Sequence, residues 1–434
     1  MRDRAHGESE RAALVGLVSG AARRLEAHRS LEELAGLAET AGASVVLRVL
    51  QERQRPDAAT FLGSGKIATL ADACDESGVD LVIFDNELTP AQLRQIEARL
   101  NRKVIDRTQL SLDIFAARAR TREGKWQVEL AQLRYLLPRL VGAGVALSRL
   151  GGGIGTRGPG ETKLETDRRK IRQRITAIAH EIETVRRRRS LSRERRRKAS
   201  VPTVALVGYT NAGKTTLFNL LTRESAQTSD ALFVTLDPLV RRVRVVDRFE
   251  FLLSDTVGFI DRLPHTLVAA FRATLEEVVG ADLLLHVVDV AAPGRDRREA
   301  AVRSVLEEVG AAEVPVLPVF NKGDLITEAE RARLQQGEPG ALCVSARSGE
   351  GRRELVDAIA ARLALDTVRV TLKFDTRSQA DRQRITHLYQ HGRVLVHVAR
   401  DAEVSIQADV PRRWLGRFVS GRDGADARGR EETR

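Results

Sequence analysis

Short apolar runs alternate with amphipathic stretches over the first 120 residues of the chain. The apolar runs have the length and composition of strands and occupy residues 13–18, 44–50, 79–85 and 103–106. The amphipathic stretches repeat apolar positions at helical spacing and occupy residues 31–40, 67–77, 90–100 and 110–120. Strands that alternate with helices of about ten residues predict a small α/β domain with a largely parallel sheet.

The hydrophobic period changes after this region. Apolar residues are then spaced alternately four and three positions apart, at Trp126, Leu130, Leu133, Leu137 and Leu140. The same spacing returns at Ile171, Ile175, Ile178, Ile182 and Val185. Two stripes of this kind predict two long amphipathic helices that pack as an antiparallel hairpin.

A glycine-rich segment separates the two stripes and continues to about residue 163. Six of the ten residues 151–160 are glycine, and each glycine loses much backbone entropy when it is ordered. The segment and its flanks also carry Arg149, Arg157 and Lys163. One interpretation is a plain flexible connector; the other, which the basic residues favour, is a tip that binds a phosphate chain.

The alternation of strands and helices returns after residue 202 with more strongly apolar strands. These strands are predicted at residues 203–207, 250–255, 282–289 and 314–321. A last segment combines strand-like residues 369–374 and 394–399 with helix-like residues 380–389.

These patterns predict five parts along the chain. They are an N-terminal α/β domain (1–120), a helical hairpin with a glycine-rich tip (121–199), a second α/β domain (200–365), a small α+β domain (366–420) and a disordered tail (421–434).

The composition limits the class of protein. Of the 434 residues 42% are hydrophobic and 30% charged, which is typical of a soluble globular protein. No apolar run reaches the roughly 18–20 residues that a membrane helix needs, and the N-terminus lacks the profile of a signal peptide. The two cysteines, Cys74 and Cys343, have no metal-ligand spacing. We therefore expect neither a disulfide framework nor a zinc site, and a reduced cytoplasmic compartment.

Positive charge is the most informative bulk feature. The net charge is +12, and 62 of the 71 basic residues are arginine. The planar guanidinium suits phosphate and RNA contacts, although the codon bias of a GC-rich genome would also raise the arginine count. Nine of the residues 186–198 are basic and only Glu194 is acidic. Such a run is typical of a nucleic-acid-binding or solvated helical face.

Candidate chemistry begins at residues 208–215, which read GYTNAGKT and match G-x-x-x-x-G-K-[ST]. The segment follows the apolar strand 204–207 and precedes a helical pattern, which is the context that a phosphate-binding P-loop requires. Backbone N–H groups of such a loop converge on phosphates. Lys214 is predicted to reach the β- and γ-phosphates, and the Thr215 hydroxyl to bind Mg²⁺.

An upstream segment, 63–67, resembles half of this motif. Thr60 stands where the first glycine belongs, and Ile67 replaces the hydroxyl that binds magnesium. We interpret this segment as a turn from a strand into a helix.

A P-loop binds the phosphates of a nucleotide but does not select its base. A second motif, NKGD at residues 321–324, is predicted to select the base, and it follows the apolar strand 314–320. The Asp324 carboxylate can accept both hydrogens from guanine N1 and N2, which adenine does not offer. Asn321 is predicted to brace the loop, and Lys322 to lay its stem on the base. The Ala346 N–H is predicted to donate to guanine O6.

Two segments between these motifs have the character of switches. Asp255 ends a strand and is predicted to hold Mg²⁺ through a water, while the Gly258 N–H contacts the γ-phosphate. Thr235 is predicted to close on Mg²⁺; Thr228 is the alternative, but Thr235 is better placed before the next strand.

Phe259 follows Gly258 at the place where Ras has the glutamine that orients the attacking water. A phenylalanine cannot bond that water, so we expect slow intrinsic hydrolysis that a partner or another residue completes.

The predicted site has three overlapping sets of residues. Lys214, Thr235 and Gly258 are assigned to hydrolysis, and Thr215, Thr235 and Asp255 to the metal. The nucleotide-binding set is Gly208, Tyr209, Thr210, Asn211, Ala212, Gly213, Lys214, Thr215, Phe233, Val234, Thr235, Leu236, Asp237, Asp255, Thr256, Val257, Gly258, Asn321, Lys322, Gly323, Asp324, Ser345 and Ala346.

The order of these motifs resembles the translation-factor-related GTPases. Residues 151–169, which read GGGIGTRGPGETKLETDRR, together with 208–219, 233–238 and 255–260, look like the HflX family of the Obg–HflX superfamily. The resemblance covers about residues 12–420. It implies an α/β fold in which a P-loop GTPase domain follows an N-terminal α/β domain with a long helical hairpin and precedes a small α+β domain.

The resemblance also implies a function. Members of the family are Mg²⁺-dependent GTPases that bind the large ribosomal subunit and its rRNA and split stalled or idle ribosomes. The N-terminal region with its glycine-rich tip reaches toward the peptidyl-transferase region, and the ribosome stimulates hydrolysis. This sequence has Val234 where the family commonly has alanine, and residues 237–240 lack the usual threonine-rich continuation, which leaves the conformation of this switch open.

Two other classes of function compete with this interpretation. One is a regulatory GTP-binding switch with a protein or membrane-surface effector, because positive charge also suits an anionic membrane. The other, a nucleic-acid-stimulated ATPase, is opposed by the NKGD motif. We expect a cytoplasmic monomer that binds GTP and GDP, with peripheral membrane association as a further interaction.

Overall fold

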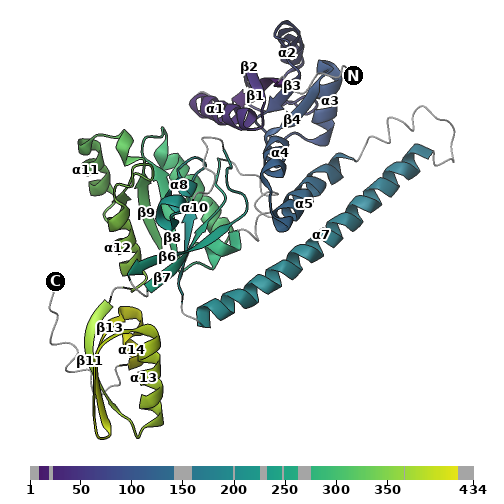
Figure 1. Cartoon of the computed structure of the whole chain (residues 1–434). Helices are drawn as coiled ribbons and strands as arrows, with labels where there is room; N and C mark the ends of the chain where they lie inside the picture. The colour runs from purple at the N-terminus through teal and green to yellow at the C-terminus, as the bar shows by residue number, and fades with distance from the viewer. Residues whose placement is uncertain are drawn as a thin grey trace.

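Three β-sheets organise the computed structural model, which describes residues 9–18, 23–140, 159–198, 201–224, 232–246, 249–261, 275–365 and 367–418 (Figure 1). Within this part of the chain, no helix has the length and apolar composition to span a bilayer. The mixed α/β fold that the sequence predicted is confirmed.

The first sheet has four parallel strands in the order β2-β1-β3-β4. The strands are β1 (Arg11–Val18), β2 (Ser44–Glu52), β3 (Leu81–Phe84) and β4 (Lys103–Asp106). They alternate with the helices α1 (Arg24–Thr40), α2 (Ser64–Glu76), α3 (Pro90–Leu100) and α4 (Arg107–Arg118). All four residues of β3 are buried, because apolar cores lie on both faces of the sheet.

Two helices form the predicted antiparallel hairpin, α5 (Arg122–Arg139) and α7 (Pro159–Lys198), and Figure 1 shows them side by side. Arg174 of α7 pairs with Glu129 of α5 at 2.6 Å, and Ile178 is buried. The prediction that the loop continues to residue 163 is wrong, because α7 already begins at Pro159. Proline is tolerated in the first turn of a helix, where its missing N–H needs no partner. Residues 141–158, with most of the glycine-rich tip, lie outside the described residues.

The second sheet has six strands in the order β10-β9-β8-β5-β7-β6. The strands are β5 (Thr203–Val207), β6 (Leu239–Val246), β7 (Phe249–Asp255), β8 (Leu283–Asp289), β9 (Val316–Asn321) and β10 (Leu342–Cys343). The helices are α8 (Lys214–Thr222), α10 (Arg295–Glu308), α11 (Glu328–Gly337) and α12 (Arg352–Arg362), with a short turn η2 (Gly323–Leu325). The edge strand β6 is antiparallel to β7. The sequence analysis gave no bounds for it, because its arginines dilute the apolar pattern.

The third sheet is antiparallel, in the order β11-β13-β12. It consists of β11 (Thr367–Asp375), β12 (Arg393–Arg400) and β13 (Glu403–Pro411), covered by α13 (Gln379–His391), η3 (Arg412–Trp414) and α14 (Leu415–Phe418). The sequence analysis missed the central strand β13. Its alternation was legible in the sequence, because Val404, Ile406, Ala408 and Val410 stand at every second position. All four are buried.

The first and second sheets share one apolar core. The cluster joins Leu14 of β1 and Phe115 of α4 to Phe233 and Val257 beside the second sheet. The N-terminal region therefore packs directly on the segments that the sequence analysis assigned to the switches.

Candidate nucleotide-binding site

A cavity of about 470 Å³ opens beyond the carboxyl ends of the parallel strands of the second sheet. Its walls come from the β5–α8 loop, the segment before β6, the segment after β7, and the loops after β9 and β10. Ligands of open α/β sheets bind at this edge. Four motifs that lie far apart in the sequence thus line one cavity.

Most of the predicted nucleotide-binding residues line this cavity. They are Thr210, Asn211, Gly213, Lys214, Thr215, Phe233, Val234, Thr235, Thr256, Gly258, Asn321, Lys322, Asp324 and Ala346. The other predicted residues do not line it, namely Gly208, Tyr209, Ala212, Leu236, Asp237, Asp255, Val257, Gly323 and Ser345. The sequence analysis missed Thr216, Leu325 and Arg347, each of which directly follows or lies next to a predicted residue.

The two glycines of the P-loop are required by close backbone approach. Gly208 has φ 152°, and a Cβ there would overlap the Val287 carbonyl oxygen. Gly213 has φ 89°, and a Cβ there would overlap the Asn321 side-chain nitrogen. Both positions exclude other residues on conformational and steric grounds.

Lys214 begins α8 and folds back over the P-loop. Its Nζ donates to the carbonyl oxygens of Gly208 at 3.0 Å and Tyr209 at 2.8 Å. Burial lowers the pKa of Lys214 to about 8, and the nearby Asp255 carboxylate opposes this shift. A phosphate placed in the loop would add negative charge beside the ammonium and favour its charged form.

The three residues predicted to bind the metal lie together. Asp255 Oδ2 accepts hydrogen bonds from Thr215 Oγ1 at 2.8 Å and from Thr235 Oγ1 at 3.0 Å. Asp255 Oδ1 is buried and has no bonding partner among the described residues. Burial raises the pKa of the Asp255 carboxyl, with Lys214 opposing. Two hydroxyls and a carboxylate are the hard oxygen donors that Mg²⁺ prefers, so the residues present fit this ion.

Asn321 connects the P-loop to the loop after β10. Its Nδ2 donates to the Ala212 carbonyl at 2.8 Å, and its Oδ1 accepts from the Ala346 N–H at 2.9 Å. The side chain is 1% exposed. The amide that was predicted to donate to guanine O6 is therefore engaged with Asn321 in this structure.

The remaining residues of the base motif differ in their surroundings. Lys322 has a left-handed backbone (φ 64°), and its Nζ pairs with Asp289 at the end of β8 at 2.7 Å. The sequence analysis missed Asp289, although its place at the end of an apolar strand was a usable signal. Asp324 lines the cavity, whereas Ser345 is buried and its hydroxyl accepts the Ser348 N–H.

Phe259 is fully buried, and its backbone exchanges hydrogen bonds with the P-loop. The Phe259 N–H donates to Gly208 O at 3.1 Å, and Phe259 O accepts from Thr210 N at 2.7 Å. A Cβ on the neighbouring Gly258 would lie 2.8 Å from Thr210 Cγ2 and 3.1 Å from Lys214 Nζ. Glycine therefore allows the segment after β7 to close on the P-loop.

Tyr209 connects the P-loop to two other segments. Its hydroxyl accepts the Asp261 N–H at 2.7 Å and bonds the Glu33 carboxylate of α1. Glu33 also pairs with the buried Arg107 at 2.7 Å. Burial raises the pKa of Tyr209, and the Glu33 carboxylate adds to the shift.

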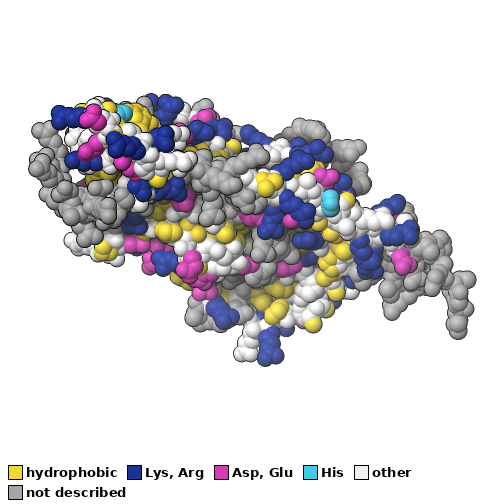
Figure 2. Space-filling view, turned by 90° about the horizontal axis from the view of Figure 1, so that it is seen from below, with side chains coloured by type: hydrophobic (Ala, Val, Ile, Leu, Met, Phe, Trp, Pro, Cys, Tyr) yellow, Lys and Arg dark blue, Asp and Glu magenta, His cyan; other side chains and the backbone are white. Residues whose placement is uncertain are grey.

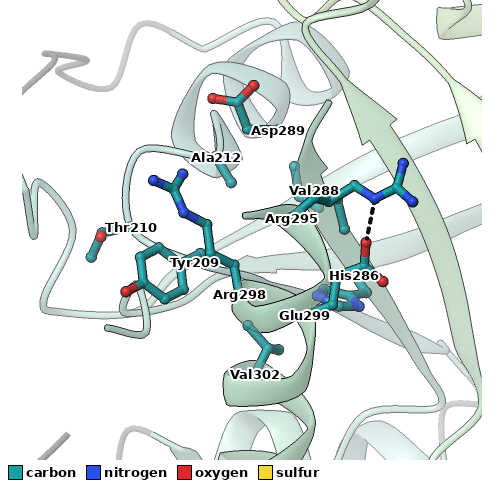
Figure 3. A pocket seen from close by; sticks show the side chains of 11 residues that line it. Tyr209, Thr210, Ala212, His286, Val288, Asp289, Arg295, Arg298, Glu299 and Val302 are labelled. Carbon is teal, nitrogen blue, oxygen red and sulfur yellow. Dashed lines mark ion pairs between the residues drawn. The ribbon is translucent and has the colours of Figure 1, made fainter. Parts of the chain in front are cut away.

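A small pocket lies behind the P-loop, between β8 and α10 (Figure 3). Arg298 covers the Tyr209 ring at 5.1 Å, and Arg295 pairs with Glu299 at 3.1 Å. His286 of β8 also lines this pocket, and burial lowers its pKa to about 4. The imidazole is therefore neutral near pH 7.

The upstream half-motif is a turn into a helix, as predicted. Gly63 precedes α2, its N–H donates to Gln51 Oε1 at 2.9 Å, and Ile67 is buried in the apolar core. Thr228, the alternative to Thr235, lies outside the described residues.

Three family models match consecutive parts of the chain. A model described as GTP-binding GTPase N-terminal matches residues 28–116, and one described as GTP-binding GTPase Middle Region matches residues 118–196. A third, described as 50S ribosome-binding GTPase, matches residues 203–322.

Curated relatives named GTPase HflX match over most of their length. The protein of Caldanaerobacter subterraneus subsp. tengcongensis is 45% identical over 403 residues, which cover 93% of this chain and 91% of the relative. That of Alkalihalophilus pseudofirmus is 52% identical over 303 residues, 70% of this chain and 72% of the relative. That of Escherichia coli is 45% identical over 383 residues, 88% of this chain and 89% of the relative.

Proposed function

The chain belongs to the HflX family of GTPases, and from this premise we propose that it binds the large ribosomal subunit and splits stalled or idle ribosomes. The observation that carries the proposal is the convergence of the P-loop, both switch segments and NKGD on one cavity, most of whose lining lies within residues 203–322, which a 50S ribosome-binding GTPase model matches. In this function the protein would hydrolyse GTP to GDP and phosphate.

The proposed roles of the site residues follow from their chemistry. Asp324 selects guanine, and Asn321 holds the base loop against the P-loop. Lys214 and the loop amides bind the β- and γ-phosphates. Thr215 and Thr235 directly, and Asp255 through a water, would hold Mg²⁺, which would neutralise phosphate charge. The Gly258 N–H contacts the γ-phosphate. Phe259 cannot bond the attacking water, so a partner or another residue would position it.

The basic run on α7 supports an RNA partner only in part. Arg186 pairs with Glu276 outside the hairpin, and Arg189 pairs with Glu123 of α5, so these two guanidiniums hold α7 against the rest of the chain. Arg187 and Arg188 are exposed. Basic side chains are scattered over the face seen in Figure 2 rather than gathered in one patch.

The proposal is tested by single-turnover GTP hydrolysis with and without purified large ribosomal subunits. We expect strong stimulation that declines as salt rises, since contacts to RNA phosphates release counterions. Light scattering of intact ribosomes should fall when the protein and GTP are added. Absence of stimulation would contradict the ribosomal proposal. Stimulation by anionic lipid vesicles instead would favour the membrane-surface switch.

A charge-reversed variant, Arg188→Glu, tests α7 itself. Arg353→Glu on α12 is the matched control, because its side chain is 92% exposed and lies outside the hairpin. We expect weaker ribosome binding for Arg188→Glu alone, with GDP affinity unchanged in both variants. Equal ribosome binding by both would remove α7 from the interface.

We also propose that the protein is a cytoplasmic monomer organised in five parts, which are residues 1–120, 121–199, 200–365, 366–420 and 421–434. Sedimentation of the pure protein near its mass of 47.9 kDa would support a monomer.

A further inference from the structure

Thr235 lies in the segment before β6, between two residues whose side chains contact residues before position 125. The Phe233 ring packs against Phe115 of α4, with centroids 4.5 Å apart, and is 2% exposed. Phe233 has a left-handed backbone, φ 56°, which costs a bulky residue about 1–3 kcal/mol and persists only where packing holds it. The segment that carries Thr235 is therefore fixed at one end by the N-terminal region.

The other end is fixed by Asp237, whose carboxylate bonds the two residues directly before α5. Its Oδ2 accepts the N–H groups of Arg120 at 2.9 Å and Thr121 at 2.8 Å, and its Oδ1 bonds the Thr121 hydroxyl. Thr121 caps α5 by accepting the Gly124 N–H at 2.9 Å. A helix N-terminus presents unpaired N–H groups and a positive dipole end, and both stabilise a carboxylate.

Gly124 makes this approach sterically possible. A Cβ at this position would overlap Asp237 Oδ1 and lie 3.1 Å from Asp237 Cγ. Glycine in a helix is otherwise unfavourable, by about 1 kcal/mol relative to alanine. The closeness of the carboxylate accounts for its presence in the first turn of α5.

We propose that Thr121 and Gly124 are positioning residues for GTP hydrolysis: they hold Asp237, and through it Thr235, at the metal site. The first helix of the hairpin thereby becomes part of the switch. This inference rests on the proposed role of Thr235 in binding Mg²⁺. Because linkage is reciprocal, closing Thr235 on the γ-phosphate side also favours the seating of α5 on Asp237.

The first test compares Gly124→Ala with Gly65→Ala in α2, where an added Cβ meets nothing within 4 Å. We measure the affinities for GDP and for a non-hydrolysable GTP analogue with Mg²⁺, and the single-turnover rate. For Gly124→Ala we expect the analogue-to-GDP affinity ratio and the rate each to fall about tenfold, as for the loss of a charge-assisted hydrogen bond. GDP affinity and the values for Gly65→Ala should stay within about twofold of the unaltered chain.

The second test uses Thr121. Thr121→Ser keeps the hydroxyl and should preserve the analogue-to-GDP ratio, whereas Thr121→Val removes it and should reproduce Gly124→Ala. A merely structural role would instead lower GDP affinity and the thermal midpoint together, for every variant that perturbs α5.

An unchanged analogue-to-GDP ratio in Gly124→Ala would overturn the inference, as would an equal loss of GDP affinity. Failure of the proposed function is separate. If the unaltered chain hydrolysed GTP equally well after Mg²⁺ was removed by chelation, the proposed role of Thr235 in binding Mg²⁺ would be wrong. This result would not depend on the behaviour of the variants.

Discussion

The proposed guanine side of the cavity is held by bonds within residues 203–365, whereas the proposed metal side also depends on residues before position 125. On the guanine side, Asn321 bonds both Ala212 and Ala346, and Lys322 pairs with Asp289. On the metal side, Thr235 bonds Thr215 and Asp255, but its chain neighbours are anchored on α4 and α5.

The difference separates base recognition from switching. A pocket that must recognise guanine in both GTP and GDP keeps its shape best when its hydrogen bonds do not change between the two states. A segment that closes only on the γ-phosphate gains from anchors that a partner can move, because switch loops are ordered by the γ-phosphate and released on hydrolysis. The N-terminal region supplies those anchors.

The largest effect is expected from Asp324→Asn on the guanine side. The amide presents a hydrogen to guanine N1, so GTP affinity should fall at least about 100-fold, while xanthosine nucleotides gain affinity. Competition between GDP and xanthosine diphosphate (XDP) measures this change in base preference. The exposed Asp357→Asn is the control. The comparison predicts an undisturbed metal side, so XTP should be hydrolysed at the rate of the unaltered chain with GTP. Unchanged GTP preference would disprove the assignment of the base pocket.

Asn321→Ala should have the next largest effect. It leaves the Ala212 carbonyl and the Ala346 N–H buried without their partner, at about 1–3 kcal/mol each. Urea unfolding should therefore show a clear loss of free energy of unfolding, and titration should show GDP affinity lowered more than about tenfold. If only GTP affinity fell and GDP affinity did not, the guanine side would not be the fixed half.

Acid should weaken the nucleotide domain through His286, which lies behind the P-loop. Its folded pKa, about 4, lies below the usual 6.5, so the free energy of unfolding declines as the pH falls from 6.5 toward 4. Between pH 7.5 and 5 the His286 side chain binds a proton in the unfolded state but not in the folded state. The free energy of unfolding therefore falls by about 2 kcal/mol. His286→Leu should remove this part of the pH dependence in urea unfolding. An equally steep loss in the variant would assign it to other groups.

The smallest effect is expected from the contact between Tyr209 and Glu33, a second link from the N-terminal region to the switches. Tyr209→Phe and Glu33→Gln should each slow single-turnover hydrolysis about threefold to tenfold. The double variant should be no slower than the worse single one, which gives a coupling of about 1 kcal/mol. Tyr389→Phe in the third sheet is the control. Simple additivity would show that the two residues act separately and would weaken the comparison.

The parts of the site predicted from sequence are those whose chemistry lies within a few consecutive residues. The P-loop is legible because Gly208, Gly213 and Lys214 lie close together in one turn between a strand and a helix. Asn321 and Asp324 are legible for the same reason. The Ala346 amide was assigned to the base from the motif alone, and only the fold revealed that Asn321 accepts its hydrogen.

Strands and helices could likewise be predicted where their local sequence pattern was strong. The apolar strands β5, β8 and β9 stand out by composition, whereas the arginine-rich edge strand β6 does not. The central strand β13 could have been found from its alternation, so its omission was an error of reading rather than a limit of the sequence. The start of α7 at Pro159 could not be read from glycine content, because tertiary packing can stabilise a helical turn that its residues disfavour.

The sequence by itself determined the class of enzyme, through a P-loop motif, an NKGD motif and a proposed metal-binding set in a fixed order. Only the tertiary structure decided how the switch is held. Asp237 and Thr121 are 116 positions apart, and Tyr209 and Glu33 are 176 apart. Spacing along the chain carries no information about such pairs, since only the packing of one sheet's helices against the other brings them into hydrogen-bond distance.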